Sequence, residues 1–371
     1  MSITRGFWYV LAAICAAVPL SAAAQVVLQL RGGGEQAVAS ARAVDAGLEC
    51  VVDGESVLVS WHLIRAVEGP AEGDTERWLA VGEHAWRGLT RLGRGDPFAA
   101  EPELAEALQM FGDSTGVSAL HTAAALLRCR VALGDLAGAV DPWLRLLAAG
   151  ADVEPTLARG AGVDDATGLV PALSPVFLSV ASAFGAEPIS TDPDRPDTAA
   201  SLAVLYRAAA EGGVPADDGV RGDGVRLVRA IVEAINGDDQ ARRLARLTLA
   251  TIRDESGDPW MTAWCDAAIG RSLLRESPER WAAGIGHLLA VRVRHERDLP
   301  ALAGHCLAEA AVFLDRRGGS ERAGILAREL ATSFPGHPAL GRPEVAEMLR
   351  TPAPPLGARS DDPAPQDGTR L

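Results

Sequence analysis

The pattern of apolar and polar positions changes once along the chain. Between residues 25 and 70 apolar and polar side chains alternate, whereas beyond residue 75 the apolar ones recur every three to four positions. Alternation is typical of half-buried strands, and a 3.6-residue period is typical of amphipathic helices. The sequence therefore predicts a mainly α protein, an antiparallel helical-hairpin solenoid preceded by a small β module at residues 25–70.

The β module is predicted to contain four or five short strands. Asp53-Gly54 is a strong hairpin turn signal between apolar runs at 48–52 and 56–61. Further strands are expected at residues 26–30, 37–44 and 64–67. In size and pattern the module resembles an SH3-like or Sm-like fold. That resemblance implies packing on the helical body or gripping a strand of a partner.

The helical part is predicted as hairpins on both sides of an irregular insert. Hairpin repeats are expected at 75–150 and 198–350, and residues 151–197, rich in Gly, Pro and Asp, separate them. The expected helices span residues 75–92, 97–111, 117–133, 136–149, 198–211, 225–235, 239–254, 260–274, 278–293, 302–317 and 322–333. We expect Pro142 to bend the fourth of these helices, because proline disrupts a helix interior.

One turn pattern recurs between helices. Gly95, Gly134 and Gly318 each follow a helical stretch, and the residue five positions later is Ala in all three cases. Glycine ends a helix readily because it adopts the left-handed cap conformation without a steric penalty. The small alanine is expected to let the second helix of each hairpin approach the first closely.

The clearest repeat unit spans residues 302–338. Its two predicted helices are joined by a Gly-Gly turn at 318–319, and it ends with Phe334-Pro335-Gly336-His337-Pro338. This unit resembles a degenerate tetratricopeptide repeat of the bacterial envelope type, in which a small residue opens the second helix and an aromatic-proline pair closes the unit. The resemblance implies a stack of helix pairs whose concave surface binds protein segments.

The two ends of the sequence differ from the rest. Residues 1–24 have the form of a secretory signal, with Arg5 before an apolar run at 7–20 and small residues at 22–24. They predict an exported bacterial protein, periplasmic or extracellular, that has no stable membrane span after cleavage. Residues 351–371 are polar and rich in proline, so we expect a disordered tail.

Charge and composition exclude some functions. The 371 residues include 35 basic ones, all arginine, and 49 acidic ones, which gives a formal net charge of −14. An acidic chain without a basic face is a poor sequence-independent binder of nucleic acid, because such binding depends on releasing counterions from phosphates. We therefore expect a protein or peptide partner and no nucleic acid.

Four cysteines lie outside the predicted signal. Cys50, Cys129, Cys265 and Cys306 have no Cys-x-x-Cys spacing, which argues against a zinc ribbon or a thioredoxin-type site. We favour buried free thiols on alanine-rich helices. The alternative is a disulfide, for which Cys265 and Cys306 form the most plausible pair.

The chain contains none of the common catalytic motifs. His287, His305 and Cys306 lie on helices that are expected to pack together, so a Cys–His pair or a metal site is conceivable there. Isolated histidines with a buried Cys306 are the favoured interpretation. We accordingly predict no catalytic, cofactor-binding or metal-binding residue and no cofactor.

Tryptophan and arginine are the candidate partner-binding residues. They are Trp260, Trp264, Trp281, Arg242 and Arg246. Core packing of the tryptophans and a solvated arginine face are the simpler interpretations. The prediction is an exported, non-enzymatic repeat protein that binds a protein or peptide partner as a scaffold or assembly factor in the cell envelope. The alternative is a carbohydrate-binding or hydrolytic protein with a groove lined by tryptophan and acidic residues.

Overall fold

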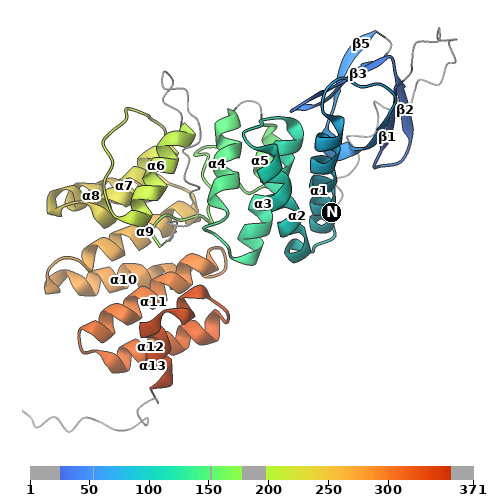
Figure 1. Ribbon diagram of the computed structural model, residues 1–371. Coiled ribbons are helices and arrows are strands. Elements are labelled where there is room, and N and C mark those ends of the chain that lie inside the picture. Colours follow the sequence, from blue (N-terminus) through green and yellow to red (C-terminus); the bar gives the residue numbers. More distant parts are fainter. Residues whose placement is uncertain (1–25, 53, 151–152, 178–197, 352–371) are drawn as a thin grey trace, which may run out of the picture. The chain divides into compact units, whose positions relative to one another are not determined.

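The computed structural model describes residues 26–52, 54–150, 153–177 and 198–351 (Figure 1). The predicted signal at residues 1–24 lies outside this set, and so does the predicted tail from residue 352 onward. The chain divides into two compact units, and each is considered by itself. One comprises residues 1–90 and 103–119, and the other comprises residues 91–102 and 120–371.

The first unit contains two antiparallel sheets of three strands each. The first has the order β2 (Glu35–Val38), β1 (Val26–Leu30) and β6 (Ile64–Glu68). The second has the order β3 (Ser40–Val44), β4 (Gly47–Val52) and β5 (Glu55–Val59). The predicted β module is therefore confirmed, including the hairpin that joins β4 to β5.

Two details of the predicted β module were wrong. The single strand expected at 37–44 is two strands that belong to different sheets, because the chain leaves the first sheet at Ala39. Trp61 does not extend a strand but begins the 3-10 helix η1 (Trp61–Leu63). Its ring is fully buried and stacks on Trp78, 6.1 Å between ring centroids, and its Nε1 donates to the carbonyl of Val44 at 2.8 Å.

The helices follow the predicted pattern closely. They are α1 (Thr75–Gly93), α2 (Pro97–Phe111), α3 (Val117–Leu133), α4 (Val140–Ala149), α5 (Pro155–Gly160), α6 (Thr198–Glu211), α7 (Asp223–Asn236), α8 (Asp239–Glu255), α9 (Pro259–Leu273), α10 (Pro278–His295), α11 (Pro300–Arg316), α12 (Ser320–Ser333) and α13 (Pro343–Arg350). A 3-10 helix, η3 (Pro338–Gly341), precedes α13. From α6 onward each helix packs against the next one in sequence, which confirms the predicted stack of adjacent helix pairs.

The fourth helix corrects the prediction. It begins at Val140 rather than at residue 136, so Pro142 lies in its first turn and does not bend it. In a first turn the backbone N–H that proline lacks would have no partner inside the helix. The sequence analysis also did not predict the short helices α5 and α13.

The recurring turn is confirmed. Gly95, Gly134 and Gly318 have φ angles of 81°, 76° and 81°, which lie in the left-handed region. The alanines five positions later, Ala100, Ala139 and Ala323, are fully buried. The Gly-to-Ala spacing therefore marks positions where the chain turns back after one helix and the next helix packs closely against it.

The described part of the insert, residues 153–177, belongs to the core of the second unit. Leu169, Leu173 and Val176 are fully buried. Three aromatic side chains hold this segment by hydrogen bonds to its carbonyls. These are Trp143 to Gly168 at 2.9 Å, Trp264 to Pro171 at 3.0 Å and Tyr206 to Leu173 at 2.6 Å. The segment consequently delivers its last described residue, Phe177, in a fixed position.

The four cysteines named above are free and buried, so Cys265 and Cys306 form no disulfide. Among the helices within the described ranges, we find none that is both long and apolar enough to cross a membrane.

Candidate functional site

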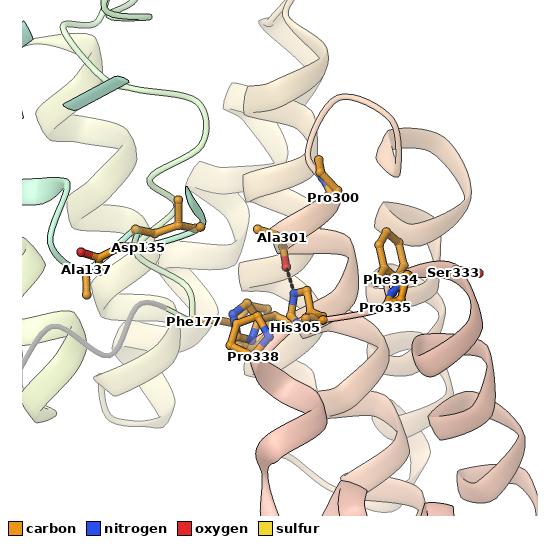
Figure 2. Close-up of a pocket in the computed structure, with 14 residues that line it drawn as sticks. Asp135, Ala137, Phe177, Pro300, Ala301, His305, Ser333, Phe334, Pro335 and Pro338 are labelled. Atoms are coloured by element: carbon orange, nitrogen blue, oxygen red, sulfur yellow. Dashed lines mark hydrogen bonds between the residues drawn. The ribbon is translucent and has the colours of Figure 1, made fainter. Parts of the chain in front are cut away.

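A pocket of about 590 Å³ opens in the second unit, among four parts of the chain that are separate in sequence. It is lined by the turn after α3, by Phe177 at the end of the insert, by the first turns of α11, and by residues 333–338 between α12 and η3. Figure 2 shows Asp135 and Ala137 on one side and Phe334 on the other, with Phe177 and His305 between them. The volume is within the range of pockets that bind small molecules or short peptide segments.

His337 forms part of the inner wall and is locked in place. Its Nδ1 accepts a hydrogen bond from the backbone N–H of Ala339 at 3.1 Å, so its Nε2 carries the proton and donates to the carbonyl of Ala301 at 2.9 Å. Burial lowers the pKa of His337 despite that second bond. The side chain therefore stays neutral and has no capacity left for a ligand.

Close packing beneath the ring adds to this restraint. A Cβ atom at Gly304 of α11 would lie 2.5 Å from Cδ2 and Nε2 of His337, which is closer than atoms can approach. Glycine at this position therefore allows the ring to rest directly on the helix.

His305 is the polar ring that lines the centre of the pocket, and the carboxylate of Asp135 lies on one side. Its ring stacks on Phe177 with 5.6 Å between centroids and meets His337 edge to face at 4.6 Å. Burial lowers the pKa of His305 to about 3, and the positive charges of Arg342 and Arg271 act in the same direction. A neutral imidazole carries one N–H donor and one acceptor. Neither nitrogen is used by the surrounding described side chains, so both are available to a ligand.

Phe177 is held between a cation and an imidazole. The guanidinium of Arg271 lies 5.3 Å from the centroid of the Phe177 ring. It also donates a hydrogen bond to the carbonyl of Val176. Phe334 has a comparable neighbour, since the guanidinium of Arg292 lies 5.4 Å from its ring centroid. A cation–π contact of this kind occupies one face of an aromatic ring and restrains the ring.

The rim of the pocket is formed largely by proline. Pro300, Pro335 and Pro338 line it and are exposed. Proline has no backbone N–H and a fixed φ, so these positions give the rim a rigid apolar surface. The site as a whole offers rings, prolines, one neutral imidazole and, on one side, the carboxylate of Asp135. This chemistry suits a largely apolar ligand that carries hydrogen-bond acceptors.

The partner-binding residues predicted from sequence lie elsewhere, and none of them lines this pocket. Trp260 and Trp264 of α9 contact each other at 5.0 Å, edge to face, and Trp264 is fully buried. Trp281 of α10 instead packs edge to face on Phe313 at 5.3 Å and lies under the guanidinium of Arg317 at 4.0 Å. The three tryptophans thus form two separate packing sites.

The two predicted arginines are engaged within the fold. Arg242 donates to the carbonyl of Gly237 at 2.9 Å and pairs with Asp239. Arg246 donates to the hydroxyl of Ser272 at 2.9 Å and pairs with Glu276. Both side chains are about 15% exposed or less and offer little surface. Arg246 connects α8 to α9, whereas the partners of Arg242 lie at the start of its own helix.

The histidines weighed as a Cys–His or metal site are also separated. His287 binds the buried carboxylate of Asp266 through Nδ1 at 3.0 Å, and Arg253 lies 3.4 Å from the same oxygen. Burial raises the pKa of Asp266, but the hydrogen bond from His287 and the charge of Arg253 outweigh burial and hold that pKa below its usual value. Cys306 lies fully buried in α11, where burial raises the pKa of its thiol. Within the described ranges no three His, Cys, Asp or Glu side chains form a group that could hold a metal ion.

The sequence analysis did not single out Phe177, His305 and Phe334 together. One signal was present, because the closing sequence from Phe334 to Pro338 had been noted as a repeat feature and supplies a third of the pocket wall. Phe177 and His305 are 128 positions apart, and only the path of the insert brings them into contact. No protein-family model, no curated protein and no solved structure matches this chain.

Proposed function

We propose that this protein is an exported, non-enzymatic helical-repeat protein that binds extended, proline-containing segments of a partner protein. The observation that carries the proposal is the pocket lined by Phe177, His305, Phe334 and exposed prolines, with the neutral imidazole of His305 available for a hydrogen bond. A role as a scaffold or assembly factor in the cell envelope follows from this mode of binding.

Proline-rich segments fit this chemistry better than other peptides do. They adopt the polyproline II conformation before binding, so they lose little conformational entropy when they dock on aromatic rings. Because proline has no backbone N–H, such a segment brings few donors that an apolar wall would leave unsatisfied. The carboxylate of Asp135 on the pocket wall accepts a hydrogen bond from the backbone N–H of Gly138 at 3.0 Å and lies 3.8 Å from Arg130.

His305 would orient the bound segment by a hydrogen bond to its backbone. A polyproline II segment exposes its backbone carbonyls, and the N–H of a neutral imidazole can donate to one of them. Because the pKa of His305 lies near 3, the ring does not become charged at any physiological pH. The hydrogen bond would therefore be independent of pH over that range.

Three further features support the finer parts of the proposal. The three Gly turns with buried alanines and the aromatic-proline closure favour a tetratricopeptide-like origin for the helix pairs. A bend at Ala39 that carries the chain from one three-stranded sheet to the other favours an SH3-like module. The signal-like residues 1–24 favour export to the periplasm or the cell exterior.

Fluorescence anisotropy with a labelled nonapeptide of alternating alanine and proline tests the proposal. We expect this peptide to bind the full-length chain more tightly than its all-alanine analogue. Phe334→Ala should weaken binding about tenfold or more, because it removes one aromatic wall. Phe98→Ala is the matched control, since Phe98 of α2 is 80% exposed and lies outside the pocket.

Three outcomes would contradict the proposal. The proline and alanine peptides could bind equally, Phe334→Ala could bind as well as Phe98→Ala, or neither peptide could bind while a soluble oligosaccharide such as cellohexaose does. The last result would favour the carbohydrate-binding alternative.

A further inference from the structure

We propose that the chain carries its own competitor for this pocket, the segment Asp362-Pro363-Ala364-Pro365. This inference rests on the proposed function, because it assumes that the pocket accepts a proline-containing segment. The observations that select this segment are its proline content and its reach, since the similar sequence Pro352-Ala353-Pro354 follows Thr351 by only one to three residues.

Reach favours the distal prolines of the C-terminal sequence. The pocket rim includes Pro338, and the chain from there to Thr351 runs through η3 and the eight-residue helix α13. From standard helix rises, these elements place Thr351 at most about 30 Å from the rim. Twelve residues separate Thr351 from Pro363, and they span about 37 Å in polyproline II conformation. Pro363 therefore reaches the pocket in whatever direction α13 leads away.

The proximal prolines lack that freedom. Pro354 and Pro355 follow Thr351 by only three and four residues, which span about 12 Å. They could enter the pocket only if α13 led back toward it. The distal pair and the proximal prolines, Pro352, Pro354 and Pro355, therefore form a natural test and control within one sequence.

Because the segment and the pocket belong to one chain, the segment can occupy the pocket even when its intrinsic affinity is weak. A segment joined by about a dozen residues has an effective concentration in the millimolar range. With an effective concentration of about 1 mM and an intrinsic Kd of about 0.1 mM, the segment would fill the pocket about 90% of the time. A partner segment would then bind about tenfold more weakly than to an empty pocket.

The test uses full-length chains and the labelled alanine-proline nonapeptide as probe. The double variant Pro363→Ala/Pro365→Ala should bind the probe about tenfold more tightly than the unmodified chain. The matched control Pro354→Ala/Pro355→Ala should bind it with unchanged affinity, because these prolines are not expected to reach the pocket.

The outcomes separate this inference from the proposed function. Equal and measurable affinity of all three chains for the probe would overturn the inference and leave the proposed function intact. Tighter binding by both double variants alike would also overturn it, because the distal pair would then have no special role. Failure of every chain to bind the probe would overturn both proposals.

A second readout locates the occupant directly. A photo-reactive p-benzoylphenylalanine in place of Ser333, which is exposed at the pocket rim, should crosslink within one chain to residues 359–371. Crosslinks confined to other parts of the chain, or found only between two copies, would contradict the inference.

Discussion

At the scale of single residues, the pocket depends on histidines that the fold keeps neutral. Burial lowers the pKa of His305 and of His337, and each ring packs against the other. An imidazole in such surroundings acts as a polar ring and not as a charge. Keeping the ring neutral lowers the free energy of unfolding only at acidic pH, where the imidazole of the unfolded chain binds a proton.

His305→Phe should therefore change how stability depends on pH. The folded pKa of His305 is about 3, and the unfolded value is near 6.5. Above pH 6.5 neither state is protonated. Between pH 6.5 and 3 only the unfolded state binds the proton, so the free energy of unfolding falls by up to about 1.4 kcal/mol per pH unit from this residue.

Urea unfolding of the unmodified chain and of His305→Phe at several pH values between 8 and 4 measures this effect. We expect the free energy of unfolding of the variant to fall less steeply below pH 6.5. Parallel curves would show that His305 titrates normally in the folded protein, against the packing described above.

Gly304→Ala tests the packing of His337. The added methyl group would overlap the imidazole ring, which must then move and lose its bond to the carbonyl of Ala301. We expect the free energy of unfolding to fall by about 2 kcal/mol. The control is Gly286→Ala in α10, where nothing lies within 4 Å of the new methyl group. That change should stabilise the helix by about 0.5–1 kcal/mol. Effects of the same sign and size in the two variants would contradict this account.

At the scale of elements, the recurring Gly turn is the feature most specific to this chain. Gly134→Ala should lower the free energy of unfolding by about 1 kcal/mol or more, because its φ of 76° strains any side chain although the space beside it is open. Gly160→Ala is the matched control, since it also faces open space but has no positive φ. Thermal or urea unfolding measures both, and equal losses would mean that the turn conformation is not the cause.

The elements themselves could be predicted from the sequence because local patterns decide them. The helices from α6 to α12 begin and end within about two residues of their expected bounds, since apolar periodicity and terminal Gly or Pro are local signals. The start of α4 was misplaced because Leu136 to Ala139 continue the apolar pattern although the chain there still forms a turn. The split between β2 and β3 depends on which sheet each half joins, which is not a local property.

The candidate site could not be predicted in the same way. Its walls come from residues near 135, 177, 305 and 335, and no periodicity relates them. A large aromatic side chain such as tryptophan can serve either a binding site or the core, and the sequence does not distinguish the two. In the structure Trp264 and Trp281 make packing contacts. Phe177 gained its role from the buried insert, whose hydrogen bonds to Trp143, Tyr206 and Trp264 join distant parts of the chain.

At the scale of the whole molecule, the account requires an exported protein whose pocket meets envelope partners. Residues 1–24 predict cleavage after Ala24. N-terminal sequencing or intact mass of the protein recovered from a bacterial periplasm or medium should therefore give a chain that starts at Gln25. Recovery of the uncleaved chain from the cytoplasm alone would contradict export and leave the chemistry of the pocket unchanged.

The most direct test of the central claim observes His305 while a proline peptide binds. The chain contains only seven histidines, so selective ¹⁵N labelling of their rings gives a spectrum simple enough to assign. During titration with the alanine-proline nonapeptide, we predict a shift of the His305 ring signals at the same midpoint as the anisotropy change. His84, which binds Glu103 at 2.9 Å in the other unit, should not respond. Saturation by the peptide without any change at His305 would contradict the claim that this pocket is the binding site.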